Sequence, residues 1–287
     1  MKTIDETNLR VRMSEEALLE GLSKTSSYNY FLSCRKVWRE IGLPPEEISN
    51  EDLRQYFISF LQKNPAKNTL SMRRASLRFL YEKVLHLERP ILANIHGGKE
   101  RKLPPYMSME EVQLLISAIN LYHYQTMSKL AFSCGLRISE VLRIRTCDID
   151  KYKMTLFIPN SKGRKDRYVP LPLRAYLLLR DYWRIKRPSS LYIFVNAKTS
   201  QPYCRESLEK SFSVARDKCA LNKCYTFHTL RHSYATCLME AGIDIRMLQV
   251  YLGHSSLKTT MMYIHMSNRA TTEAQKTVER LFSEFNY

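Results

Sequence analysis

The sequence predicts a mainly α-helical protein with a small β-hairpin or sheet, divided into two domains. The chain has 287 residues, which is longer than a usual single domain. Apolar residues recur at helical spacing along most of it, whereas one segment near the middle alternates. Proline, glycine and charge gather in residues 90–105, which predicts a linker between a domain at 1–89 and a second at 106–287.

The first domain is expected to be helical. Residues 26–39 carry apolar side chains at helical spacing. Ser49 and Asp52 resemble a capping box that opens a second helix, and a longer helix is expected over residues 68–87.

The second domain combines helices with the hairpin. Ser108 and Glu111 resemble another capping box. Residues 154–159 and 167–171 have the pattern of two strands, joined by a turn at 161–164. This pattern predicts a mixed α/β domain in which helices precede and follow one hairpin.

The net charge indicates the kind of partner. Lys and Arg number 45 against 28 Asp and Glu, which gives a net charge of +17 and a pI of about 9.6. Such an excess favours nucleic acid, with an anionic membrane surface as the rival. No apolar stretch is long enough to span a bilayer and the N-terminus has no signal-peptide core, so we expect a cytoplasmic, DNA-associated protein.

Both predicted domains are basic. Residues 1–102 hold 18 basic and 13 acidic residues, and the remainder holds 27 and 15. Two basic domains joined by a hinge predict a C-shaped clamp around double-stranded DNA.

One stretch of the first domain favours phosphate contact. It contains no acidic residue between Asp52 and Glu82. A one-sign helix face suits a polyanion better than solvent alone, although a solvated face is the alternative. We therefore expect DNA contacts from Arg73, Arg74 and Arg78.

The seven cysteines are scattered and form no Cys-x-x-Cys pair, so reduced thiols are the simplest account. Cys219 and Cys224 could be two metal ligands, but no second pair accompanies them. We expect neither a metal nor a cofactor.

Arg137 lies among apolar residues, three positions before Glu140. A plain helical ion pair would explain this spacing. The other interpretation is a partly buried guanidinium that Glu140 orients toward a phosphate, because a buried charge needs a partner.

Three basic side chains share one face of a helix that is expected to begin near residue 228. His228, Arg231 and His232 are three and four residues apart, and apolar residues fall on the opposite side. We expect this basic face to be presented rather than buried. A surface helix or half of a zinc site would also fit, but position 229 holds Thr where a zinc protease requires Glu.

Lys162 lies at the tip of the predicted hairpin, where Lys-Gly turns are usually just solvated. Arg164, Lys165 and Arg167 lie beside it, so the tip could enter a DNA groove. His254 is expected in a turn after a helix end, and Tyr263 is one of eighteen tyrosines, most of them expected in the core.

Four segments, taken in order, resemble the tyrosine recombinase (phage integrase) family. The resemblance covers about residues 103–268, whereas residues 1–89 are similar to the family's helical core-site-binding domain only in size, helix content and charge. The chain resembles the compact Xer/Cre-like type, without an arm-binding domain. The four segments run from Gly135 to Glu140, from Ser161 to Arg167, from His228 to His232 and from Leu252 to His265.

The resemblance implies a tyrosine-recombinase catalytic domain in the second half of the chain. It further implies a site-specific recombinase that cuts and rejoins DNA through a 3′-phosphotyrosyl intermediate and a Holliday junction, without metal or ATP. By the same resemblance, Tyr263 attacks the phosphate, and the negative charge that develops on the phosphate is stabilised by Arg137, Arg231 and His254. His228 would take the proton of the phenol, and Lys162 would protonate the leaving oxygen. The residues that orient this group would be Glu140 and His232.

Apolar residues at helical spacing over 274–285 predict an amphipathic C-terminal helix. It could pack on its own domain. The resemblance instead implies docking on a neighbouring protomer, within a homo-tetramer on synapsed core sites that assembles from a monomer or weak dimer.

Two other functions share some of these features. A type IB topoisomerase uses the same chemistry but rejoins the same strands, and a non-catalytic DNA-binding regulator needs only the basic surface. The complete set of catalytic residues argues against the regulator.

Overall fold

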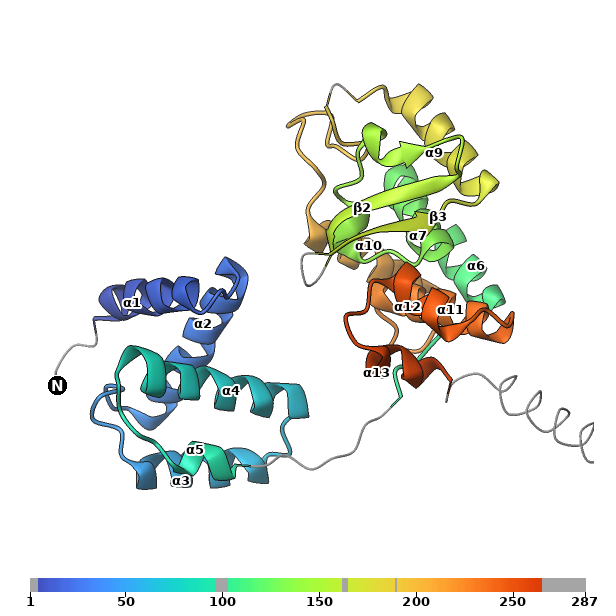
Figure 1. Ribbon diagram of the computed structural model, residues 1–287. Helices are drawn as coiled ribbons and strands as arrows, with labels where there is room; N and C mark the ends of the chain where they lie inside the picture. The colour runs from blue at the N-terminus through green and yellow to red at the C-terminus, as the bar shows by residue number, and fades with distance from the viewer. Residues whose placement is uncertain (1–4, 96–102, 162–164, 189, 265–287) are drawn as a thin grey trace, which may run out of the picture. The chain divides into compact units, whose positions relative to one another are not determined.

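The computed structural model describes residues 5–95, 103–161, 165–188 and 190–264, leaving aside the side chains of 160, 161 and 165. The chain forms two compact units, Met1–Arg101 and Lys102–Tyr287 (Figure 1). Both are mainly helical, and a small antiparallel sheet lies in the second, which confirms the predicted fold class. The predicted clamp and the predicted domain limits stay predictions.

The first unit is a set of helices whose ends follow local capping rules. At the predicted capping box, the Asp52 amide donates to Ser49 Oγ (3.1 Å) and the Ser49 amide to Asp52 Oδ2 (2.9 Å). The helix predicted over 68–87 becomes a π-helical turn at Leu80–Val84. The helices are α1 (Glu6–Leu19), α2 (Lys24–Ile41), α3 (Asn50–Gln62), α4 (Lys67–Phe79) and the short α5 (Ile91–Asn94).

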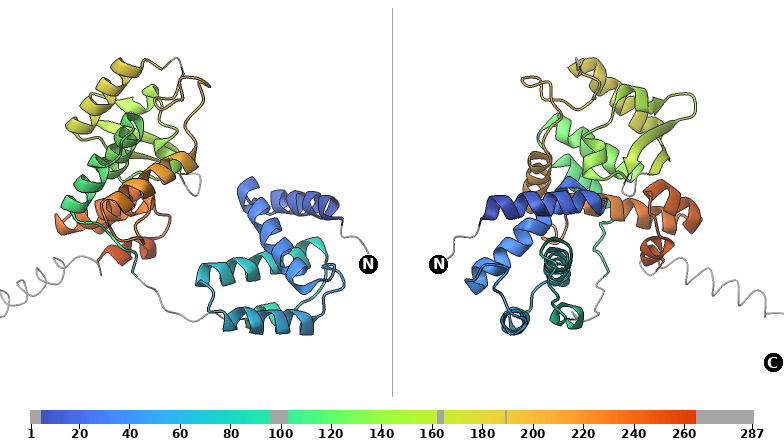
Figure 2. Two further views of the ribbon diagram at one scale, coloured as in Figure 1. Left: turned by 180° about the vertical axis from the view of Figure 1, so that it is seen from behind. Right: turned by 60° about the vertical axis from the view of Figure 1, so that its left-hand side comes forward.

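The core of this unit forms where α2 packs against α1 and α4, as two further views show (Figure 2). Cys34, Val37 and Trp38 lie on one face of α2 at helical spacing, and all three are buried. Gly42 ends α2 in the left-handed conformation, with φ of 84°.

Arg73 of α4 lies in this core, which contradicts its predicted contact with DNA. The residue is only 5% exposed, and its guanidinium carbon is 3.9 Å from the centre of the Phe60 ring. It donates to the Tyr56 hydroxyl and to Glu40 Oε2, the latter at 3.4 Å. Its hydrogen bonds are therefore made to protein groups.

The other two candidates on α4 differ from Arg73. Arg74 is half-buried and donates to the Ile95 carbonyl at 2.6 Å. Arg78 is exposed and pairs with Glu82 at 3.0 Å. The surface therefore suits DNA contact by Arg78 best of the three.

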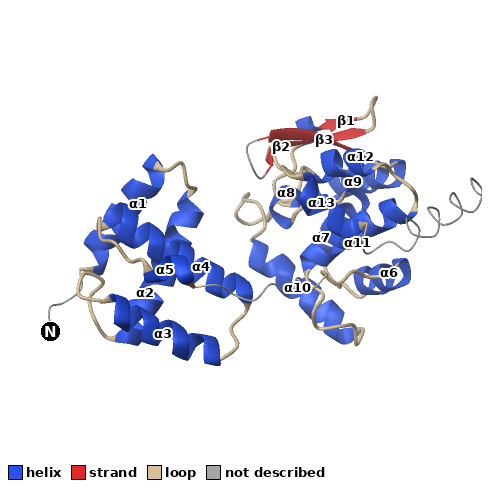
Figure 3. Ribbon diagram, turned by 60° about the horizontal axis from the view of Figure 1, so that its bottom comes forward, coloured by secondary structure: helices blue, strands red, loops and turns tan. Residues whose placement is uncertain are grey.

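The second unit places helices mostly on one side of a small sheet (Figure 3). The predicted capping box is present, since the Glu111 amide donates to Ser108 Oγ at 3.2 Å and Glu111 Oε2 accepts from the Ser108 amide. Its helices are α6 (Met109–Ser117), α7 (Tyr122–Cys134), α8 (Ile138–Val141), α9 (Leu173–Lys186), α10 (Arg205–Lys218), α11 (Phe227–Glu240), α12 (Ile245–Leu252) and α13 (Leu257–Thr260).

The described strands form one antiparallel sheet in the order β1-β2-β3. The predicted hairpin is β2 (Thr155–Ser161) and β3 (Lys165–Pro170), and β1 (Ile149–Asp150) adds a third strand that the sequence did not predict. Side chains of β3 alternate, with Arg167 and Val169 buried and Asp166 and Tyr168 exposed. Arg167 therefore points inward, away from the surface that we expected it to share with the hairpin tip.

Two contacts bring distant parts of the second unit together. α7 packs against α11, and α12 packs against both β3 and α11. Under α12 a small apolar cluster includes Tyr234, Leu248, Leu252 and Tyr263. This packing brings the ends of α7, α11 and α12 close to the inner face of β3.

Candidate active site

Arg137 stands immediately before α8, directly after the tight end of α7. Gly135 ends α7 with φ of 61°, and a Cβ there would lie 2.4 Å from the Tyr234 ring. Glycine is therefore required both by the conformation and by the close packing. The turn aims the Arg137 side chain, which is 19% exposed, toward Glu140.

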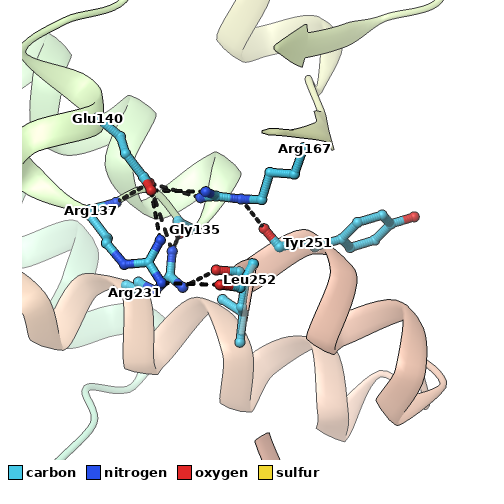
Figure 4. A network of polar contacts seen from close by, with 8 residues as sticks. Gly135, Arg137, Glu140, Arg167, Arg231, Tyr251 and Leu252 are labelled. Atoms are coloured by element: carbon cyan, nitrogen blue, oxygen red, sulfur yellow. Dashed lines mark hydrogen bonds and ion pairs between the residues drawn. The ribbon is translucent and has the colours of Figure 1, made fainter. Parts of the chain in front are cut away.

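The carboxylate of Glu140 gathers three arginines (Figure 4). It accepts from Arg137 Nη1 at 2.7 Å and from the Arg137 amide at 2.8 Å. Arg167 Nη1 and Nη2 donate to its two oxygens, each at 2.8 Å, and Arg231 Nη1 lies 3.9 Å away. Burial by itself would raise the pKa of Glu140, but the bonds and charge from Arg167 outweigh it and lower the pKa to about 2.

Arg231 of α11 is buried, contrary to the expected presentation of the basic helix face. It is 1% exposed and donates to the Gly135 carbonyl at 2.7 Å and to the Leu252 carbonyl. Burial and the nearby positive charge of Arg137 lower its pKa. Arg231 turns inward because the ends of α7 and α12 supply carbonyl acceptors for its guanidinium, whereas His228 of the same face stays exposed.

The C-terminal end of α12 offers three successive carbonyls to three different arginines (Figure 4). Arg167 Nε donates to the Tyr251 carbonyl at 2.8 Å, Arg231 to Leu252, and Arg137 Nη2 to Gly253 at 3.4 Å. Free carbonyls and the helix dipole make a helix C-terminus a favourable place for cations. The end of α12 and the Glu140 carboxylate together hold the arginine cluster.

The Tyr263 hydroxyl is hydrogen-bonded to His232 Nδ1 at 2.8 Å. Tyr263 follows α13 in a 3-10 turn, Met261–Tyr263, and is 1% exposed. Burial raises the pKa of the phenol to about 12, although Arg231 and Arg137 act in the opposite direction. At neutral pH this hydroxyl is therefore protonated and hydrogen-bonded to the His232 imidazole.

His254 and His228 complete the group around Tyr263. His254 follows Gly253, and its Nδ1 is hydrogen-bonded to Thr260 Oγ1 at 3.0 Å. Its ring lies nearly parallel to that of Tyr263, with the centroids 6.4 Å apart. The exposed His228 lies one turn from His232, with 4.7 Å between the ring centroids.

All three imidazoles are neutral at neutral pH. Burial, with added positive charge from Arg231 and Arg137, lowers the pKa of His254 to about 3. The pKa of His228 is lowered in the same direction, by the protein around its ring and by the charge of Arg231 and Arg137, although this residue keeps contact with solvent. Burial together with His228 and Arg231 lowers the pKa of His232 to about 4. Neutral rings can both accept and donate a hydrogen bond, as proton transfer requires.

The structure thus brings together Arg137, Glu140, Arg231 and Tyr263 with the three imidazoles. Lys162 and Arg164 lie outside the described residues, as does the predicted helix over 274–285, and of Lys165 only the backbone is described.

Two residues at the site were missed in the sequence. Arg167 was expected at the hairpin tip, and Thr260, the partner of His254, was not noticed. The strand alternation could have revealed Arg167, because it is in phase with the buried Val169.

Two other classes of site receive no support in the described part of the chain. Among these residues no cluster of three or more His, Cys, Asp or Glu could hold a metal ion. None of the described helices combines the length and the apolar character that crossing a bilayer requires.

Comparison with known proteins gives the class of this chain. The phage integrase family model matches residues 105–269, and the model of the phage integrase N-terminal SAM-like domain matches residues 9–91. The chain belongs to the phage integrase family, the tyrosine recombinases.

Individual relatives agree along nearly the whole chain. A protein of Sinorhizobium fredii named as an integrase/recombinase is 32% identical over 277 residues, which cover 96% of this chain and 90% of the relative. The tyrosine recombinase XerC of Lactobacillus delbrueckii subsp. bulgaricus is 31% identical, with coverage of 90% and 96%.

Solved structures share the fold. A lambda integrase tetramer bound to a Holliday junction matches with a TM-score of 0.73 at 18% identity, over 94% of this chain and 79% of that one. The Tn1549 transposon integrase in complex with transposon right end DNA matches with a TM-score of 0.71 at 17% identity, with coverage of 95% and 99%.

Proposed function

We propose that this recombinase breaks and rejoins DNA strands at a specific core site, with Tyr263 as the nucleophile. One observation carries the proposal: the buried Tyr263 hydroxyl is hydrogen-bonded to an imidazole, close to two arginines that both lie against the Glu140 carboxylate. Attack by the phenol on a phosphodiester forms a phosphotyrosyl bond and releases a 5′-hydroxyl, so the bond energy is retained for rejoining.

Arg137 and Arg231 would stabilise the charge that develops on the phosphate. Three guanidiniums surround a single described carboxylate, Glu140, so the cluster carries an excess of positive charge. Such prepositioned donors act most strongly where water is excluded. His254, neutral and beside Tyr263, would add a hydrogen bond to the same phosphate.

The proton of the phenol must pass to a base, because a pKa of about 12 keeps the hydroxyl protonated. His232 is the imidazole in contact with it, whereas the resemblance assigns the base to His228. Tyr263 is 1% exposed, so it must leave its resting place to reach a phosphate. We propose that His232 holds the phenol at rest and that His228 takes its proton during attack.

Lys162 would protonate the leaving 5′-oxygen. It belongs to the connection between β2 and β3, the position that the family motif gives to the general acid. An ammonium group has a proton to donate at neutral pH.

The partner would be double-stranded DNA carrying a core recombination site. Lambda integrase has been solved as a dimer bound to a core site and as a tetramer on a Holliday junction. We propose that this chain likewise acts as a homo-tetramer on synapsed sites, with residues 274–285 docking on a neighbouring protomer. Both basic units would then contact DNA, placing the protein on the chromosome in the cytoplasm.

Covalent trapping tests the proposal. The protein is incubated with randomised duplexes, and DNA that stays attached after denaturation is sequenced at its junction. The wild type should yield adducts at one sequence, and Tyr263→Phe should bind the same DNA without an adduct. An adduct that persists in Tyr263→Phe would contradict the assignment.

Strand exchange separates a recombinase from a topoisomerase. Two duplexes that carry the recovered site and different labels are mixed with the wild type. Recombinant products that join the two labels are expected. Relaxation of supercoiled DNA without exchange would favour the topoisomerase.

A further inference from the structure

We propose that Arg167 is a positioning residue of the recombination reaction. It holds Glu140 and the end of α12, and through them it fixes Arg137 and Arg231 in the arrangement that meets the phosphate. This inference rests on the proposed function, which uses those two arginines as phosphate ligands.

The contacts of Arg167 lead inward. Its side chain is 4% exposed, so it is enclosed by protein rather than presented to DNA. The planar fork donates to both oxygens of Glu140 at 2.8 Å, a bidentate geometry that fixes a carboxylate in orientation as well as in position. Its third bond, from Nε to the Tyr251 carbonyl at 2.8 Å, ties the same guanidinium to α12.

Arg137 depends on the carboxylate that Arg167 holds. Its short side-chain contact is the 2.7 Å bond to Glu140 Oε1, whereas its contact with the Gly253 carbonyl is long, at 3.4 Å. A carboxylate released by Arg167 could rotate toward Arg231, which is 3.9 Å away. Loss of Arg167 would therefore displace Arg137 without removing any group that contacts the phosphate.

The stem of Arg167 also packs against the turn that carries His254. A Cβ at Gly253 would lie 2.8 Å from Arg167 Cδ, and Gly253 has φ of 60°. The side chain and the glycine turn therefore fit closely. One residue of β3 thus sets the position of the carboxylate and of the end of α12, which together hold Arg137 and Arg231.

A single-turnover assay tests this role. The substrate is a nicked duplex that carries the junction sequence recovered by covalent trapping, and the rate of attachment to Tyr263 is measured with full-length protein. Arg167→Gln should slow attachment about 100-fold, as expected for a misplacement of about 1 Å. Arg167→Lys keeps the positive charge but loses the bidentate guanidinium, so its rate of attachment should lie between that of Arg167→Gln and that of the wild type.

The affinity for DNA should change less than about twofold in both variants, because Arg167 is not a phosphate contact. Arg180→Gln is the matched control: Arg180 is an exposed arginine on α9, paired with Asp181 at 3.7 Å, and its loss should leave the rate unchanged. Weakened DNA binding that accounts for the whole loss of rate would overturn the proposal.

A methylphosphonate at the scissile position distinguishes positioning from a merely structural role. This substrate lacks the negative charge that Arg137 and Arg231 neutralise, so the defect of Arg167→Gln should shrink at least about tenfold relative to the wild type. An equal loss on both substrates would mean that Arg167 serves only the fold. If Arg167→Gln does not fold, Arg167→Lys gives the same comparison.

Coupling to Glu140 supplies a second test. Because Arg167 acts through Glu140, the double variant Arg167→Gln/Glu140→Gln should lose less than the product of the two single losses. Independent losses that multiply would overturn the proposed route. A wild type that forms no adduct with any duplex would refute the proposed function itself, whatever the Arg167 variants do.

Discussion

Arg73 in the first unit and Arg231 in the second are both buried arginines, but their surroundings differ. Arg73 lies on the face of Phe60, donates to a tyrosine hydroxyl and has Glu40 as a nearby acid. Arg231 donates to two backbone carbonyls and has another arginine, Arg137, as a charged neighbour.

The two arginines also differ in the neighbouring charges that shift their pKa values. Burial lowers the pKa of both side chains, but Glu40 counteracts this for Arg73. For Arg231 the next largest influence, Arg137, lowers the pKa further. Arg73 thus has Glu40 as its nearby acid, whereas Arg231 shares Glu140 with Arg137 and Arg167, so positive charge exceeds negative charge in this cluster and a bound anion would balance it.

The sharpest test of this comparison is Arg231→Lys. Lysine keeps a positive charge but cannot reach both carbonyls while facing a phosphate, so the rate of adduct formation should fall about 100- to 1000-fold. DNA affinity should change little, since many other phosphate contacts remain. The DNA affinity and the single-turnover rate are measured side by side, and a normal rate would show that the guanidinium of Arg231 is not needed for the reaction.

Arg73→Met should lower the stability of the protein and leave the reaction rate unchanged. Methionine can fill the space of the stem, but the Tyr56 hydroxyl loses its partner and the contact with Phe60 loses its charge. The free energy of unfolding should fall by about 2 kcal/mol, as measured in urea. The adduct rate per folded molecule should stay normal, and a selective loss of rate would place Arg73 in the reaction.

Acid should destabilise the second unit through its half-buried imidazoles, His232 and His254. The pKa of His232 is about 4 and that of His254 about 3, both below the ordinary value of 6.5. The unfolded chain therefore binds protons first, and stability falls as the pH drops from about 6.5 through these values. The low pKa of Glu140, about 2, adds to the loss below about 4.5.

Thermal melting of the full chain between pH 7 and pH 4 measures this effect. His232→Asn removes one of the titrating groups, so the melting temperature of this variant should depend less on pH. A melting temperature that rises on acidification would show that these rings are charged in the folded protein.

The smallest effect is expected for Arg78→Gln. Arg78 is exposed, so its proposed DNA contact is one phosphate among many. Affinity should weaken a few-fold, and the slope of log Kd against log salt should decrease by about 1. Arg73→Met, the buried counterpart on the same helix, should leave that slope unchanged.

The sequence was sufficient for features that depend on local rules. The capping boxes at Ser49 and Ser108, the hairpin and the glycine helix end at Gly253 follow from residue type and spacing, and all are present. The motif order also placed Arg137 and Glu140 at one site.

What the sequence did not predict depends on tertiary contacts. Arg73 and Arg78 belong to the same one-sign basic stretch, but Arg73 lies on the helix face of the buried Leu70 and Leu77, and its partners Tyr56 and Phe60 come from α3. Arg231 was expected to be presented because apolar residues occupy the opposite side of its helix, but its carbonyl partners, Gly135 and Leu252, lie at the ends of α7 and α12, far from it in the chain. Backbone acceptors of this kind leave no trace in side-chain patterns.

The three successive carbonyls at the end of α12 carry a consequence for how this protein can vary. Each carbonyl serves a different arginine, and a carbonyl is present whatever the side chain, so Tyr251 and Leu252 can be exchanged as far as packing allows. The number of residues cannot change. An insertion or deletion of one residue in the last turn of α12 would shift the order of these carbonyls relative to the three arginines, so this helix end should tolerate substitution while it rejects a change in length.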